Sequence, residues 1–107
     1  MSALIIDNRL VHYEVIGRGE PVLLVHGWIG SWRYWVRTME ELSAEYRVYA
    51  VDLWGFGDSD KSGVHYAVDD YTRLLSDFQS QLGMERIHLV GHALGAAVAL
   101  RYAARFP

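Results

Sequence analysis

The segment Gly91-His92-Ala93-Leu94-Gly95 combines residue types and a spacing that suit nucleophilic chemistry. In the pattern G-x-S-x-G, a serine sits on a sharp turn between a strand and a helix, and the flanking glycines allow the two elements to approach each other. Here the central residue is Ala93, so a methyl group stands where the nucleophile is expected. The segment therefore predicts the backbone of a nucleophile site that lacks its nucleophile.

An alanine at the centre of this turn needs an explanation. The backbone of such a turn is expected to have a positive φ, which costs a non-glycine residue about 1–3 kcal/mol. Structural demand alone would favour glycine or asparagine. The flanking glycines argue against a plain helix-start alanine. Two origins stay open for Ala93: a natural residue of this protein, or an experimental replacement of a nucleophile.

The elements around this turn must hold it in place. Arg86–Val90 has the apolar content of a short buried strand, and the alanine-rich stretch Ala96–Phe106 predicts a helix that packs closely on a sheet. Upstream, Ala3–Ile6 and Leu10–Ile16 are predicted to form a hairpin, and Val22–Val25 and Arg47–Val51 are predicted to be strands. Two helices are also predicted. One is capped by Ser31 and has Trp35, Met39 and Leu42 on its buried face, and the other spans Ala67–Leu82. Strands that alternate with helices in this way predict an α/β fold with a parallel sheet.

Two other motifs follow predicted strands. His26-Gly27-Trp28 comes after Val22–Val25, and Asp52-Leu53-Trp54-Gly55-Phe56-Gly57-Asp58-Ser59 comes after Arg47–Val51. Together with residues 91–95, their order and spacing resemble the N-terminal half of an α/β-hydrolase-fold protein of the serine esterase or lipase type. The resemblance covers essentially the whole chain, residues 1–107, as the N-terminal portion of one such domain.

The resemblance implies roles for individual residues. The backbone N–H groups of Trp28 and Leu94 would form the oxyanion hole beside residue 93. His26, Gly27, Trp32 and His92 would lie around the substrate, with Trp28 and Trp32 as candidates for lining an acyl pocket. Trp35 is interpreted as helix packing, and Asp58-Ser59 receive no catalytic part. In the family the triad acid and the general-base histidine follow the elbow helix, so they are expected beyond Pro107.

Three functions from different classes remain open. The first is a segment of a hydrolase of carboxylic esters or similar acyl bonds, inactive as written. The second is a non-catalytic protein that binds a small acyl or aromatic ligand. The third is an assembly fragment that pairs through the edge of Arg86–Val90 with itself or with a C-terminal half. The dehalogenase and epoxide-hydrolase branches, which the resemblance associates with aspartate at this turn, remain an alternative ancestry for Ala93.

Composition excludes other classes. A formal net charge of −3 without a cluster of Lys or Arg gives no footprint for nucleic acid or an anionic membrane, and no cofactor or metal is expected. Asp60 stands where a dinucleotide-binding G-x-G-x-x-G needs its third glycine. His88 and His92 straddle a strand end and a turn and do not share a face, which favours structural or substrate-facing histidines over a zinc pair. His12 and His65 are expected at the surface. The absence of cysteine and of a signal or membrane segment at the N-terminus favours the cytoplasm.

Overall fold

One sheet organises the molecule. The computed structural model describes residues 2–28, 30–61 and 67–106. In these residues the strands are β1 (Ser2–Ile6), β2 (Arg9–Ile16), β3 (Glu20–Val25), β4 (Tyr46–Val51) and β5 (His88–Gly91). Their spatial order is β1-β2-β4-β3-β5, with β3 parallel to both β4 and β5, and with β1 and β2 antiparallel at one edge. The predicted hairpin followed by parallel strands is confirmed.

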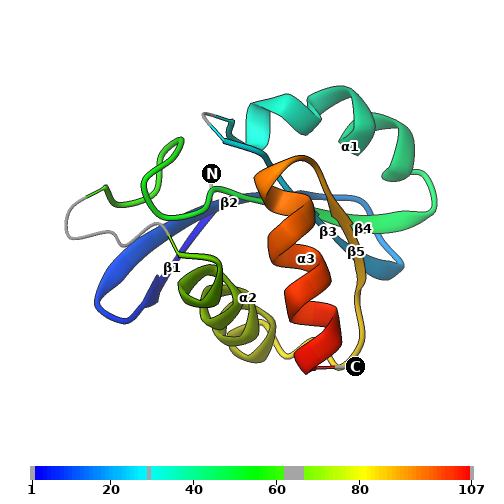
Figure 1. The fold of residues 1–107 in the computed structure, drawn as a ribbon. Coiled ribbons are helices and arrows are strands. Elements are labelled where there is room, and N and C mark those ends of the chain that lie inside the picture. The colour runs from blue at the N-terminus through cyan, green and yellow to red at the C-terminus, as the bar shows by residue number, and fades with distance from the viewer. Residues whose placement is uncertain (1, 29, 62–66, 107) are drawn as a thin grey trace.

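Helices cover both faces of this sheet. A 3₁₀ turn, η1 (Trp32–Trp35), leads into α1 (Val36–Leu42), and α2 (Val68–Gln81) and α3 (Leu94–Arg105) follow later. Figure 1 shows α1 on one face, and α2 and α3 side by side on the other, in agreement with the α2–α3 contacts. As predicted, the Ser31 side chain caps η1 by accepting a hydrogen bond from the backbone N–H of Arg33.

Two apolar clusters hold the layers together, one on each face of the sheet. Alternate residues of β3 enter different clusters, because successive side chains of a strand point to opposite faces. The cluster under α1 consists of Val22, Leu24, Trp35, Met39, Val48 and Ala50. The larger cluster under α2 and α3 includes Leu23, Val25, Val51, Tyr71, Leu75, Phe78, Val98 and Tyr102. Burial on both faces explains the continuous apolar runs that predicted these strands.

Some sequence-based predictions differ from the structure. β5 begins at His88, two residues later than predicted, and α3 begins at Leu94, two residues earlier. The expected surface position of His12 is wrong: its side chain is 1% exposed. Burial is possible because both ring nitrogens hydrogen-bond to carboxylates, Nδ1 to Asp52 and Nε2 to Glu14. His65 lies outside the described residues.

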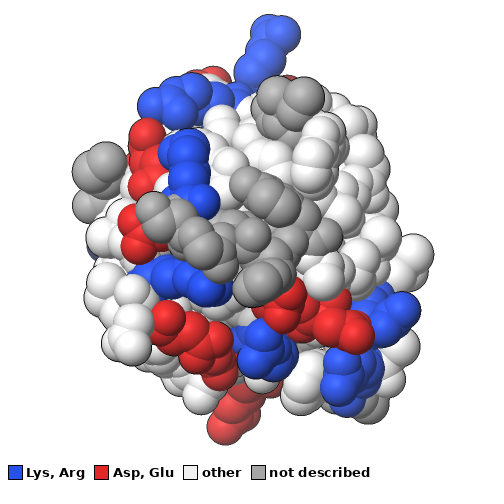
Figure 2. Space-filling view, turned by 60° about the vertical axis from the view of Figure 1, so that its left-hand side comes forward, with Lys and Arg blue, Asp and Glu red and all other residues white. Residues whose placement is uncertain are grey.

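The surface carries charges of both signs. On the face shown in Figure 2, the described Lys and Arg side chains are interspersed with Asp and Glu side chains. Among the described residues, no helix has the length and apolar character that crossing a membrane requires.

Candidate functional site

Ala93 occupies the sharp turn between β5 and α3. The strand ends at Gly91, the helix begins at Leu94, and Ala93 is the N-cap residue, with φ 53° and ψ −116°. The positive φ expected from the sequence is present, and the residue is exposed. Because a parallel strand delivers residue 93 to the rim of the sheet, a side chain at this position faces a space where a ligand can bind.

The glycines on either side allow this turn to form. A Cβ atom added to Gly91 would lie 2.4 Å from the carbonyl oxygen of Gly95. A Cβ atom added to Gly95 would lie 2.1 Å from the carbonyl oxygen of Val25. Strand β5, helix α3 and the end of β3 therefore meet backbone to backbone. A side chain at either glycine would push the helix away from the sheet.

His26 fixes the start of the β3–η1 loop, residues 26–31. Its ring is fully buried. Nδ1 hydrogen-bonds to the carbonyl oxygen of Gly27 at 2.7 Å, and Nε2 accepts the backbone N–H of Leu53 at 3.1 Å. This pattern requires the neutral ring with its proton on Nδ1. Burial accordingly lowers the pKa of His26 below its ordinary value of 6.5, against smaller raising effects of the Gly27 hydrogen bond and the Asp52 charge.

The β3–η1 loop packs directly against the elbow. A Cβ atom added to Gly27 would lie 3.0 Å from both the Cβ of Ala93 and the carbonyl oxygen of His92. Trp28 follows at once, and its exposed ring packs edge-on against Phe56 with 5.3 Å between ring centroids. Leu94 is the first residue of α3, where a backbone N–H has no acceptor within the helix and the helix dipole favours negative charge.

The two remaining residues predicted to lie near the substrate, His92 and Trp32, are found in different surroundings. His92 is exposed beside Ala93, and its ring stacks on Tyr34 with 4.6 Å between centroids and 24° between planes. Trp32 is half-buried, and its ring packs edge-on against His12 at 6.2 Å, with the Arg33 guanidinium over its face. Substrate contact by either ring stays a prediction. Both ring nitrogens of His26 are hydrogen-bonded to the protein backbone, so the loop that follows His26 faces the site and its ring does not.

A buried polar network around Asp52, next to the loop, was not predicted from the sequence. The Asp52 carboxylate is fully buried and accepts hydrogen bonds from the backbone N–H of Trp32 at 2.7 Å and of Asp58 at 2.9 Å. Its Oδ2 also lies 2.8 Å from His12 Nδ1. Ligand atoms of His12, Asp52 and Asp58 lie within 4.8 Å of one another, but the Asp52 oxygens are already occupied by these partners, so we assign no metal to them.

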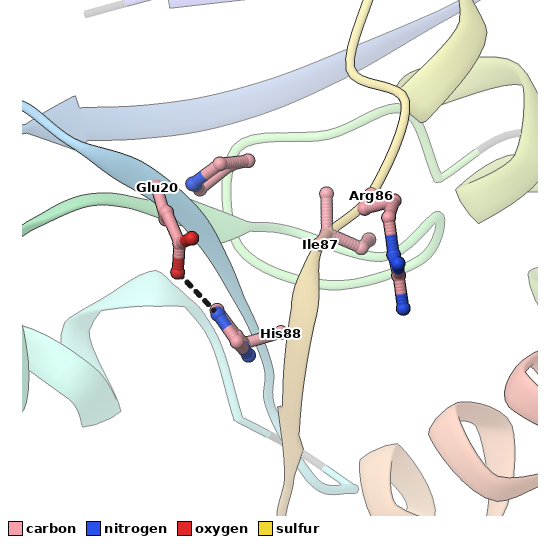
Figure 3. Close-up of a pocket in the computed structure, with 5 residues that line it drawn as sticks. Glu20, Arg86, Ile87 and His88 are labelled. Atoms are coloured by element: carbon pink, nitrogen blue, oxygen red, sulfur yellow. Dashed lines mark hydrogen bonds and ion pairs between the residues drawn. The ribbon is translucent and has the colours of Figure 1, made fainter.

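The opposite end of the strands carries a separate hollow. Figure 3 shows two of its lining residues, Glu20 and His88, the first residues of β3 and β5, which point toward each other and are joined by a 3.0 Å hydrogen bond. Its volume is about 380 Å³, and Pro21, Arg86 and Ile87 complete its lining. None of the predicted site residues lies here. The predicted site residues around Ala93 lie at the other rim of the sheet.

Comparison with known protein families supports the resemblance drawn from the three motifs. A family model described as alpha/beta hydrolase fold matches residues 20–107. The chain belongs to the alpha/beta hydrolase fold family. The elbow, the His26-Gly27 loop and the turn after β4 all lie inside the matched range.

Individual alpha/beta hydrolases match along most of the chain. A 2-hydroxy-6-oxo-2,4-heptadienoate hydrolase of Pseudomonas putida is 40% identical over 96 residues, which are 86% of this chain and 35% of that protein. A soluble epoxide hydrolase of Corynebacterium sp. is 33% identical, over 92% of this chain and 34% of that protein. A solved meta-cleavage product hydrolase from Pseudomonas fluorescens, a serine-to-alanine mutant complexed with acetates, superimposes with a TM-score of 0.90 at 32% identity, covering 99% of this chain and 40% of the other. The chain spans about a third of the length of the curated relatives it matches.

Proposed function

We propose that this chain forms the nucleophile elbow and the oxyanion hole of a hydrolase that cleaves carboxylic esters or similar acyl bonds. One observation carries the proposal. Ala93 has a strained backbone, with φ 53°, on an exposed turn that needs glycines at 91 and 95, and the turn lies against Gly27 of the β3–η1 loop. Ordinary packing does not require a strained alanine, whereas presenting a reactive side chain does.

In an active relative of this type, the residue at position 93 is the nucleophile. A serine hydroxyl there would attack the carbonyl carbon, and a histidine supplied by another part of the fold would take its proton. The negative oxygen of the tetrahedral intermediate would accept hydrogen bonds from the N–H groups of Trp28 and Leu94. Ala93 has no hydroxyl, and loss of a triad nucleophile lowers kcat by on the order of 10⁶. The chain as written is therefore expected to bind without turnover.

The rings around the elbow indicate what kind of ligand fits. Trp28 and Tyr34 are both more than half exposed, and Tyr34 is stacked on His92 next to Ala93. Such rings provide apolar walls for the acyl or aromatic part of a substrate. Similarity to hydrolases named for heptadienoate and epoxide substrates is compatible with either serine or aspartate as the ancestral nucleophile. We propose the serine chemistry.

Two measurements test this function. A ¹⁵N-labelled sample titrated with sodium acetate should show saturable shifts of the Trp28 and Leu94 amide resonances, and sodium chloride at equal ionic strength should not reproduce them. In a longer protein that supplies the remaining strands of the fold, the Ala93→Ser variant should hydrolyse p-nitrophenyl esters while the alanine form stays inactive. A reconstituted serine variant with no ester hydrolysis would reject the proposal.

A second proposal concerns partners. β5 pairs only with β3 among the described strands, and Leu100 of the adjacent helix is 74% exposed. We propose that the open edge of β5 pairs with a strand of a further hydrolase segment or of a second copy. Light scattering should show association that weakens in a Val90→Lys variant. A chain that stays a monodisperse monomer at high concentration and also fails to bind a separately added C-terminal segment would contradict it.

A further inference from the structure

We propose that Asp52 is a positioning residue for the β3–η1 loop and that it acts together with the neutral ring of His26. The inference rests on the proposed function, because the loop matters through the Trp28 N–H that it carries. Asp52 does not approach residue 93 and is not a catalytic residue. It acts through the backbone of the loop.

The loop is held at both of its ends by two consecutive residues at the exit of β4. At its start, the His26 ring accepts the backbone N–H of Leu53 at 3.1 Å. At its end, the backbone N–H of Trp32 donates to Oδ1 of Asp52 at 2.7 Å. The loop is thus tied to residues 52 and 53 on either side of Trp28. Between these anchors, the N–H of Gly30 closes a tight turn on the carbonyl oxygen of Gly27 at 3.0 Å.

Asp52 is itself fixed, so it can serve as an anchor. Its side chain is fully buried, and Oδ2 is shared by His12 Nδ1 and the N–H of Asp58. The turn after β4 also wraps closely over it, because a Cβ atom on Gly57 would lie 2.3 Å from Oδ2. A buried carboxylate needs all of these partners, and hydrogen bonds to a charged group are the stronger ones. The carboxylate therefore cannot turn away from Trp32 without leaving donors unpaired.

This arrangement prepares the oxyanion hole before a ligand arrives. Donors aimed in advance at a developing negative charge contribute more than donors that must be reoriented. Loss of the Asp52 anchor would free one end of the loop while the His26 anchor remained. The Trp28 N–H would then sample orientations away from the ligand.

Amide exchange and acetate affinity of the labelled chain test the inference. Asp52→Ala should accelerate exchange of the Trp32 amide at least about tenfold and weaken acetate binding at least about tenfold, as expected for loss of a charge-assisted hydrogen bond. Asp52→Asn keeps an acceptor oxygen and should recover part of both effects. Asp58→Asn is the matched control. This exposed side chain lies near His12 and Arg33 and makes no hydrogen bond to the backbone of the described loop residues, so the substitution should change both quantities less than twofold. The amides of α2 report whether each variant is folded.

A measurement on the unsubstituted protein keeps the inference testable if Asp52→Ala fails to fold. The N–H···N hydrogen bond should give a scalar coupling between the ¹⁵N nuclei of Leu53 and His26 Nε2, and absence of this coupling would overturn the inference. Unchanged acetate affinity in both Asp52 variants, with acetate bound normally by the unsubstituted chain, would also overturn it. A coupled and protected loop that binds no acetate in any form would support the anchoring and reject the acyl-binding function instead.

Discussion

Gly27 and Ala93, which lie 66 residues apart in sequence, meet so closely that a Cβ atom on Gly27 would lie 3.0 Å from the Cβ of Ala93. The contact joins the β3–η1 loop to the elbow. A side chain at position 27 would be tightly packed, because the methyl group at 93 and the carbonyl oxygen of His92 would have to move by a few tenths of an ångström to admit it.

Substitution at this contact should show energetic coupling. We expect Gly27→Ala to lower the free energy of unfolding by about 1–3 kcal/mol through overpacking. Ala93→Gly removes the facing methyl group. The free energy of unfolding of the double variant should therefore exceed the value expected from adding the two single effects, by about 0.5 kcal/mol or more. Urea unfolding of the four proteins measures the cycle. Additive effects would show that the two positions do not press on each other.

The strained backbone at residue 93 makes a separate prediction. Ala93→Gly should raise the free energy of unfolding by about 1 kcal/mol, since relief of strain exceeds the entropy cost of glycine. Ala93→Ser should leave stability within about 0.5 kcal/mol of the parent, because the residue is exposed. Thermal and urea unfolding would check both variants. A destabilised glycine variant would mean that the turn is not strained at this residue.

The close contact of α3 with β3 predicts a large effect of one methyl group. Gly95→Ala would place a Cβ atom 2.1 Å from the carbonyl oxygen of Val25 and 2.5 Å from that of His26. Because both neighbours are backbone atoms, we expect a loss of about 3 kcal/mol or an unfolded protein. Ala97→Ser, at an exposed position of the same helix, is the control and should cost about 0.5 kcal/mol or less. Circular dichroism and urea unfolding distinguish the two.

Acidification should destabilise the protein through His26. Its pKa is lowered in the folded protein, chiefly by burial, whereas the unfolded chain protonates near the ordinary value of 6.5. Below that pH the unfolded state binds more protons, so this contribution to stability is complete above 6.5 and is lost as the pH falls toward the folded pKa. A protonated Nε2 would also face the Leu53 N–H as donor against donor.

NMR titration of the His26 ring and urea unfolding from about pH 8 to about pH 5 measure this effect. His26→Asn should remove this part of the pH dependence, and the difference from the parent isolates it from the other histidines. A ring that titrates at or above 6.5 in the folded protein would contradict the prediction.

Much of the fold was predictable because its signals are local. The apolar run of β3 and the turn glycines define their elements within a few residues of chain, and Ser31 caps η1 as its position suggested. The elbow was predictable for the same reason, since five consecutive residues specify it. The boundaries of β5 and α3 shifted by two residues because pairing with β3 and the N-cap at Ala93, rather than residue type, decide where they begin and end.

The polar network was missed because its parts are distant in sequence. His12 lies on a strand whose alternation predicts an exposed face, and its partner Asp52 is 40 residues away. Only the completed sheet places the carboxylate of Asp52 between His12 and the N–H of Trp32. The His26 hydrogen bond to Leu53 has the same character, with 27 residues between its partners. A sequence motif can therefore predict where a loop lies, but the hydrogen bonds that fix the loop depend on residues that only the folded structure brings together.

The turn at residue 93 owes its shape to neighbouring glycines and to the loop beside it, not to the side chain that it displays. The reactive group and the backbone that presents it are therefore separable at this position. A single substitution at residue 93 can introduce or remove a nucleophile while the close contacts at Gly27, Gly91 and Gly95 keep the same turn.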